Sequence, residues 1–163
     1  MLKILVTNDD GYSSKGIEVL NNVASNFGDT IIVAPNSEKS GKAHGITLYD
    51  PIGLKKIDNQ NQLIYSVDGT PVDCVKIAIN SLLDKKPKLI LSGINHGLNV
   101  GRSILYSGTV SAASESIMIG IPSIAFSLQK SEEMDFTNVD IILEKLIKNA
   151  LSNFLFSLRF FCR

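Results

Sequence analysis

The stretch Lys3-Ile4-Leu5-Val6-Thr7-Asn8-Asp9-Asp10-Gly11 begins the chain with a largely apolar run that ends abruptly in a polar turn. An uninterrupted apolar run is typical of a strand buried on both faces of a parallel sheet. In open α/β sheets, ligands bind beyond the carboxyl ends of the strands. We therefore expect Asp9 and Asp10 side by side at a ligand-binding edge. The alternative is an ordinary surface turn, because Asn, Asp and Gly are common turn residues.

Two adjacent carboxylates repel each other, and proteins usually keep such a pair ionised by placing a cation beside it. Oxygen ligands alone favour a hard ion such as Mg²⁺, Mn²⁺ or Ca²⁺. Asp9 and Asp10 are thus candidate metal ligands. Asn95, in a later loop, offers a neutral oxygen that would complete the shell, although a single loop asparagine more often binds its own backbone.

Length and composition describe one globular domain. The chain has 163 residues, of which 44% are hydrophobic and 20% are charged, enough for a single core. Sixteen basic residues balance sixteen acidic ones, which argues against a nucleic-acid platform. The two cysteines, Cys74 and Cys162, have no metal-binding or disulfide spacing, and no signal peptide or transmembrane run is apparent. We therefore expect a cytoplasmic protein with no membrane partner.

Helical and strand patterns alternate along the chain, which predicts an α/β domain with a mostly parallel sheet. Hydrophobic periodicity predicts helices over residues 17–27, 71–82, 107–118 and 139–150. Buried strands are predicted at residues 3–7, 30–34, 88–92 and 123–127. Short strands at residues 46–48, 54–57 and 63–67 are predicted to form a small antiparallel excursion.

Three loops are expected to meet at one edge of this sheet, because each leaves a predicted parallel strand. They are Asn8–Gly11, Pro35–Gly45 and Gly93–Thr109. Ser107-Gly108-Thr109 begins a predicted helix, where free backbone N–H groups and the helix dipole favour a phosphate. Helix capping alone is the simpler interpretation of this triplet. His44 and His96 lie in the same loops and could move a proton or hold a phosphate, although an exposed histidine without a chemical role is the commoner case.

An acidic pair near a phosphate-binding helix start indicates metal-assisted attack of water on a phosphoryl group. Other nucleotide and hydrolase signatures are missing from the sequence. Gly93, Gly97 and Gly101 do not have the spacing of a dinucleotide site, and there is no P-loop or nucleophile elbow. The residues by themselves therefore predict a phosphate hydrolase.

Seven sequence blocks occur in a fixed order: Ile4–Gly11, Val33–Pro35, Ser40–Gly41, Ile46–Thr47, Gly69–Val75, Ser92–Gly97 and Tyr106–Val110. Together they resemble the survival protein E (SurE) family of metal-dependent nucleotidases. The resemblance implies a Rossmann-like, three-layer α/β/α domain over residues 1–150. It also implies removal of phosphate from nucleoside 5′-monophosphates, with 3′-monophosphates as further substrates, by a homodimer or tetramer.

The same resemblance implies roles for individual residues. It implies one divalent ion per subunit, Mg²⁺ or Mn²⁺, with four ligands: Asp9, Asp10, Ser40 and Asn95. The implied phosphate contacts are Asn8, Ser107, Gly108 and Thr109. Asp9 and Asn8 are the implied catalytic residues. The ion would lower the pKa of a water molecule that attacks phosphorus, and the group that takes the water's proton is not assigned.

Residues 151–163 form a tail with four phenylalanines that does not resemble the family. One alternative is therefore an inactive remnant, produced by truncation or a shifted reading frame, whose unpaired strand edge promotes aggregation. In the opposing alternative, the tail folds back and replaces the missing strand. A receiver-type signalling module also has an acidic pair after its first strand. It needs an aspartate after its third parallel strand, where this chain has Ser92–Asn95.

Overall fold

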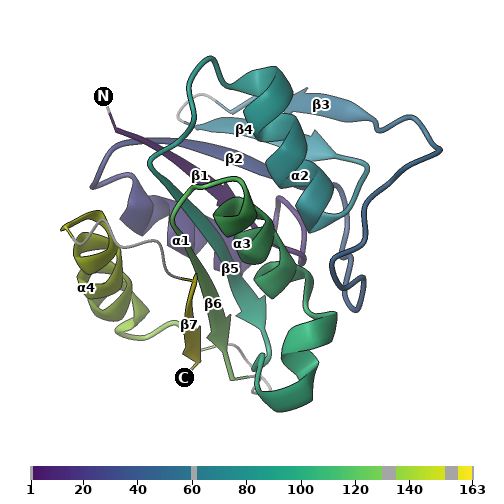
Figure 1. Cartoon of the computed structure of the whole chain (residues 1–163). Coiled ribbons are helices and arrows are strands. Elements are labelled where there is room, and N and C mark those ends of the chain that lie inside the picture. Colours follow the sequence, from purple (N-terminus) through teal and green to yellow (C-terminus); the bar gives the residue numbers. More distant parts are fainter. Residues whose placement is uncertain (1, 60–61, 130–134, 153–157, 163) are drawn as a thin grey trace.

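The centre of the molecule is a seven-stranded β-sheet (Figure 1), in a computed structural model that describes residues 2–59, 62–129, 135–152 and 158–162. The strands stand in the order β3-β4-β2-β1-β5-β6-β7. In chain order they are β1 (Lys3–Thr7), β2 (Asp29–Pro35), β3 (Leu54–Ile57), β4 (Leu63–Val67), β5 (Leu89–His96), β6 (Ser123–Leu128) and β7 (Leu158–Cys162). The first strand of the chain is therefore the middle strand of the sheet.

All neighbouring strands run parallel except β3 and β4, so the predicted mostly parallel sheet is confirmed. β4 pairs in parallel with β2, which leaves β3 as the one antiparallel strand among the described residues. The strand predicted at residues 46–48 is wrong. There the backbone N–H of Thr47 donates to the carboxylate of Asp73 rather than to a neighbouring strand.

Helices cover both faces of the sheet (Figure 1), with α1 (Lys15–Ala24) and α4 (Val139–Ser152) on one face and α2 (Pro71–Ile77) and α3 (Gly108–Met118) on the other. A π-helix over Ala78–Leu82 continues α2, and a 3-10 helix over Gly101–Tyr106 precedes α3. The expected three-layer, Rossmann-like arrangement is confirmed. None of the described helices is long and apolar enough to cross a membrane.

The first turns of α2 and α3 are fixed by polar side chains. The Ser107 hydroxyl accepts a hydrogen bond from the backbone N–H of Val110, which caps α3. Thr70 and Asp73 form a reciprocal capping box on α2, and Pro71 stands near its start. Such caps satisfy N–H groups that have no partner inside the helix. They therefore determine where both helices begin.

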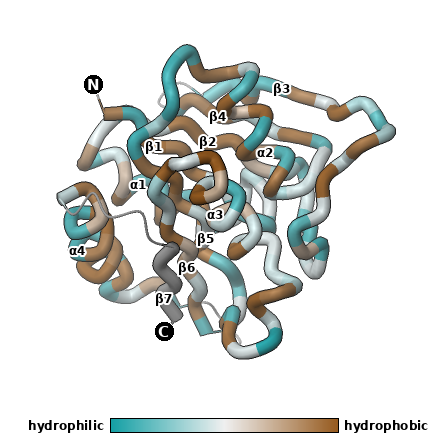
Figure 2. The backbone as a smooth tube through the Cα atoms, viewed as in Figure 1, coloured by the Kyte–Doolittle hydropathy of each residue, from teal (hydrophilic) through white to brown (hydrophobic). Residues whose placement is uncertain are grey.

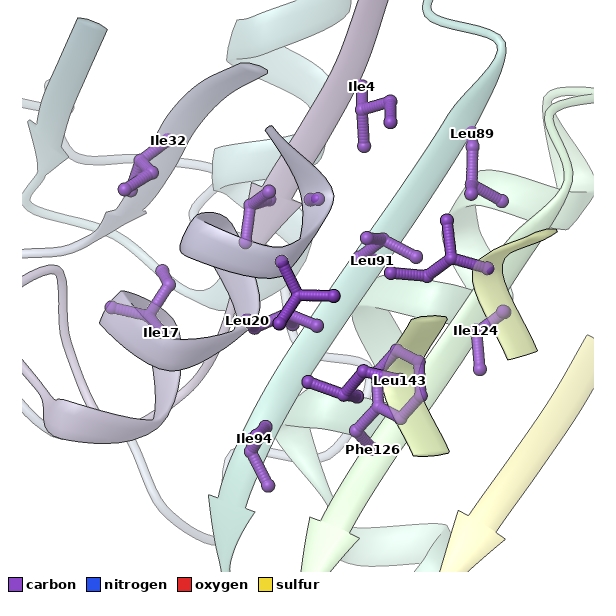
Figure 3. Close-up of a cluster of buried hydrophobic side chains, with 14 of the residues drawn as sticks. Ile4, Ile17, Leu20, Ile32, Leu89, Leu91, Ile94, Ile124, Phe126 and Leu143 are labelled. Atoms are coloured by element: carbon purple, nitrogen blue, oxygen red, sulfur yellow. The ribbon is translucent and has the colours of Figure 1, made fainter. Parts of the chain in front are cut away.

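Two apolar layers attach the helices to the sheet, and Figure 2 shows hydrophobic segments along the central strands. Figure 3 shows the layer beneath α1 and α4, where side chains of both helices meet those of β1, β2, β5 and β6. Its labelled members are Ile4, Ile17, Leu20, Ile32, Leu89, Leu91, Ile94, Ile124, Phe126 and Leu143. This burial on both faces explains why the central strands are continuous apolar runs.

β5 continues to His96, four residues beyond the end predicted for it. Its pairing with β6 shifts register between Ser92 and Asn95. Helix α1 approaches this irregular segment closely, since a Cβ on Gly16 would lie 2.2 Å from the carbonyl oxygen of Ile94. Only glycine allows that approach, so Gly16 determines how close α1 lies to the carboxyl end of β5.

The tail forms the edge strand β7, which pairs in parallel with β6 over Leu158–Cys162. The expectation of an unpaired edge beside β6 is therefore wrong. The opposing alternative, in which the tail takes the place of a strand, agrees with the structure. The physical reason is the row of backbone groups on β6, which a following extended segment can pair.

We predict that Leu143→Ala lowers the free energy of unfolding by about 2–5 kcal/mol, because Leu143 is 2% exposed in the layer under α4. Ile141→Ala, two residues away on the same helix, is the matched control. Ile141 is 48% exposed, so its truncation changes stability by about 0.5 kcal/mol or less. Urea unfolding of both variants measures the difference. Equal losses would show that α4 does not pack on the sheet as described.

Candidate metal and phosphate site

The candidate site lies at the carboxyl ends of the adjacent strands β1 and β5. Thr7 of β1 stands opposite Ser92 of β5 in the parallel register, so the residues that follow both strands reach the same edge. A direct contact joins them, because the backbone N–H of His96 donates to Asp10 Oδ2 at 3.3 Å. The predicted meeting of the first and third loops is therefore confirmed.

Asn8 is fully buried and holds the turn after β1 together. Its side-chain amide donates to the carbonyl oxygen of Gly11 at 2.9 Å and to the hydroxyl of Ser14 at 2.8 Å. Its Oδ1 accepts from the N–H of Gly11 at 3.2 Å. These bonds use the side chain to connect the turn to the start of α1. Its implied catalytic and phosphate-binding role stays a prediction.

Asp9 contacts the first turn of α3 directly. The hydroxyl of Thr109 donates to Asp9 Oδ1, and it also lies 3.5 Å from Asn95 Oδ1. Gly108 permits this contact, because a Cβ there would lie 2.8 Å from the Asp9 Cβ and 2.9 Å from the Pro71 ring. The turn expected to bind phosphate thus touches one of the expected metal ligands.

The two carboxylates are held in surroundings that disfavour their charges. Burial raises the pKa of Asp9, and bonds from Thr109 offset part of that effect. Burial, and then the charge of Asp9, raise the pKa of Asp10 to about 6, while His96 acts in the opposite direction. Glu38 adds further negative charge to both. A cation between these groups would relieve both the desolvation and the repulsion.

The second loop also reaches the site, although Ser40 does not contact the aspartates here. The backbone N–H of Lys39 donates to the carbonyl oxygen of Asp9 at 2.8 Å. The exposed Ser40 donates its hydroxyl to Glu38 at 2.6 Å. Glu38 is a site residue that sequence reasoning missed. No sequence signal marked it, because its influence depends on how the loop folds back to Asp9.

The two histidines occupy different surroundings. His96 stands beside Asp10, as its backbone contact shows. His44 instead pairs with Glu115 of α3 at 3.0 Å, and Lys76 of α2 binds the other oxygen of that carboxylate at 3.3 Å. His44 therefore connects the second loop to the helices. Sequence reasoning missed Glu115 because its partners are far away along the chain.

The oxygen atoms present suit a hard divalent cation. Asp9, Asp10 and Asn95 provide carboxylate and amide oxygens. No cluster of three His, Cys, Asp or Glu side chains suited to a metal occurs among the described residues. Mg²⁺ is commonly bound by one or two carboxylates, with water and substrate phosphate completing its shell. The buried hydroxyls of Thr7 and Ser92, just below this edge, find no partner in the described structure, as expected where water belongs to a site.

A comparison with protein-family models matches residues 4–160 to the survival protein SurE family. The chain belongs to the SurE family. The matched range ends within the phenylalanine-rich tail, three residues before the last residue of the sequence. The seven short sequence blocks predict membership of this family, and the resemblance is confirmed over nearly the whole chain.

Individual SurE relatives agree with this assignment. The 5′-nucleotidase SurE of Caldanaerobacter subterraneus subsp. tengcongensis is 46% identical over 150 residues, which cover 91% of this chain and 59% of the relative. That of Alkaliphilus metalliredigens is 46% identical over 92% of this chain and 60% of its own length. The solved SurE protein from Aquifex aeolicus superposes with a TM-score of 0.84 and 41% identity, over 93% of this chain and 60% of that chain. This SurE chain therefore spans about 60% of the length of these relatives.

We predict that the chelator-treated protein becomes less stable as the pH rises from about 4 to 6. Asp10 has a folded-state pKa of about 6, against the ordinary aspartate pKa of 3.8, so in this range the native state binds more protons than the unfolded state. The free energy of unfolding then falls with rising pH, and Asp9 acts in the same direction.

Urea unfolding at several pH values measures this slope for the wild type and for two variants. Asp10→Asn should flatten it, whereas Asp50→Asn, at an exposed loop position, should leave it unchanged. A slope that survives in Asp10→Asn would show that this carboxylate does not carry the effect.

Proposed function

We propose that this chain supplies the metal and phosphate site of a nucleotidase that hydrolyses nucleoside 5′-monophosphates. The observation that carries the proposal is the contact between Asp9 and the start of α3. It brings a candidate cation-binding carboxylate and a candidate phosphate-binding helix terminus within one hydrogen bond. A phosphate monoester needs both, because its charge is shared between a metal and N–H donors during transfer. The names of the SurE relatives give the substrate class.

In this proposal Asp9, Asp10 and Asn95 hold one divalent ion, Mg²⁺ or Mn²⁺, and Ser40 joins them by turning from Glu38. When bound, the ion supplies Lewis-acid activation of water and of the phosphoryl group. Thr109 orients the Asp9 carboxylate through its hydroxyl.

The first turn of α3 binds the phosphate oxygens and stabilises their growing charge. Ser107 and Gly108 contribute their backbone groups to this turn, and the hydroxyl of Ser107 also caps the helix. Asn8 keeps the turn after β1 rigid. Capping and phosphate binding are thus compatible roles for one triplet.

Finer features of the proposal come from the family resemblance. We expect 3′-monophosphates as further substrates, a homodimer or tetramer, and a cytoplasmic location. These features concern the whole enzyme, whereas the geometry described above concerns the site alone. An assay with matched 5′- and 3′-monophosphates of one nucleoside separates the two activities.

We predict that Asp9→Asn lowers phosphate release from nucleoside 5′-monophosphates by about a hundredfold or more. Loss of a metal ligand should lower activity at least as much as loss of a residue that only orients a ligand. Loss of such an orienting residue typically lowers activity roughly 10- to 100-fold. The measurement is phosphate release from a panel of monophosphates, with Mg²⁺, with Mn²⁺ and with excess chelator.

Asp84→Asn is the control, because exposed Asp84 precedes β5 at the opposite edge of the sheet. It should keep wild-type activity. Turnover that persists in chelator, or an Asp9→Asn variant as active as Asp84→Asn, would contradict the proposed metal site.

A further inference from the structure

The connection from β2 to β3, residues 36–53, has no helix or strand, yet several hydrogen bonds fix its first half. It runs along the side of the molecule beyond α2 (Figure 1). The N–H of Lys39 donates to the backbone carbonyl oxygen of Asp9, and the N–H of Ala43 donates to the carbonyl oxygen of Tyr106 at 3.1 Å. Ser40 lies between these two bonds. The segment that carries the proposed fourth ligand is therefore attached on both sides.

A stronger attachment follows at Thr47, which binds the carboxylate of Asp73 on α2. Its hydroxyl donates to Asp73 Oδ2 at 2.7 Å, and its backbone N–H lies 3.1 and 3.3 Å from the two carboxylate oxygens. Thr70 N–H donates to the same Oδ2 at 2.9 Å. Asp73 is only 3% exposed, and hydrogen bonds to a buried carboxylate are among the strong ones.

Asp73 is also close to the wall of the site. Pro71, two residues earlier in α2, has its ring 2.9 Å from the place where a Cβ on Gly108 would lie. The first turn of α2 therefore packs against the first turn of α3, beside Asp9. One carboxylate thus connects the second loop to the helix turn that borders the phosphate position.

We infer that Asp73 is a positioning residue that fixes the Ser40 segment through Thr47. The effect of this positioning on metal binding rests on the proposed function. The hydrogen bonds between Thr47 and Asp73 are seen in the structure itself. Thr47 is the last anchored residue before the exposed Leu48 and Tyr49, which are 68% and 95% exposed. Without the bond at Thr47, the free part of the connection would extend back to His44. Its pair with Glu115 and the bond at Ala43 would then be the last attachments after Ser40, so the distance between Ser40 and Asp9 would be held less tightly.

Two substitutions at Thr47 test this role without disturbing the cap on α2. Thr47→Val removes the hydroxyl donor and keeps the shape, and Thr47→Ser restores the donor. Asp73→Asn is a third variant, but it also weakens the capping box. Asp50→Asn is its control, since it removes an exposed acid from the same connection.

The first measurement is hydrogen exchange of the backbone N–H groups of residues 38–47 in metal-free protein. Thr47→Val should speed their exchange about tenfold, the change expected when a hydrogen bond to a charged group is lost. Thr47→Ser and Asp50→Asn should exchange like the wild type. Unchanged exchange in Thr47→Val, or equal changes in Thr47→Ser, would overturn the inference.

The second measurement is the Kd of Mn²⁺, by calorimetry, with thermal unfolding as the test of folding. Thr47→Val should raise the Kd about tenfold at an unchanged melting temperature. A wild-type Kd in Thr47→Val would overturn the positioning role and leave the proposed function standing. If the wild type binds no Mn²⁺, the proposed function and the effect of Asp73 on metal binding both fail, while the exchange measurement still decides the attachment. If it binds Mn²⁺ but hydrolyses no nucleotide, the proposed function fails while this inference is still decided by Thr47→Val.

Discussion

The close approach of α3 to the end of β1 is the constraint on which the site depends. It is possible because residue 108 is glycine, since any Cβ there would collide with Asp9 and with the ring of Pro71. The approach lets the Thr109 hydroxyl reach Asp9 and brings the first turn of α2 to the same place. Three elements distant in sequence thereby share one point of contact, and each was fixed there by its own cap or turn.

This arrangement places the buried Asp9 and its partly buried neighbour Asp10 near the positive end of a helix. Burial favours the neutral forms of Asp9 and Asp10 and raises the pKa of both, while the positive end of a helix favours an anion. The protein alone satisfies Asp9 in part, through Thr109. A divalent cation and a phosphate together would satisfy all of these groups, because each neutralises charge that the other leaves. Metal and phosphate binding are therefore expected to depend on one another.

The sequence predicted much of this fold because local patterns determine much of it. The apolar run before Asp9, the cap at Thr70 and the helix start at Ser107 each act over a few residues. Other features depend on contacts between distant residues, which no local pattern reveals. The parallel pairing of β4 with β2, the extension of β5 to His96 and the edge strand β7 are of this kind.

The candidate site divides in the same way. Its aspartates, Asn95 and the turn at Ser107 follow from strand ends, whereas Glu38, Asp73 and Glu115 act through the folded second loop.

The most direct test of the account is the affinity for inorganic phosphate, measured by calorimetry with and without Mn²⁺. Adjacent metal and phosphate positions predict that phosphate binds about tenfold or more tightly when Mn²⁺ is present, within the usual range of coupling between sites. Equal affinities under both conditions would contradict a shared site at Asp9 and the start of α3.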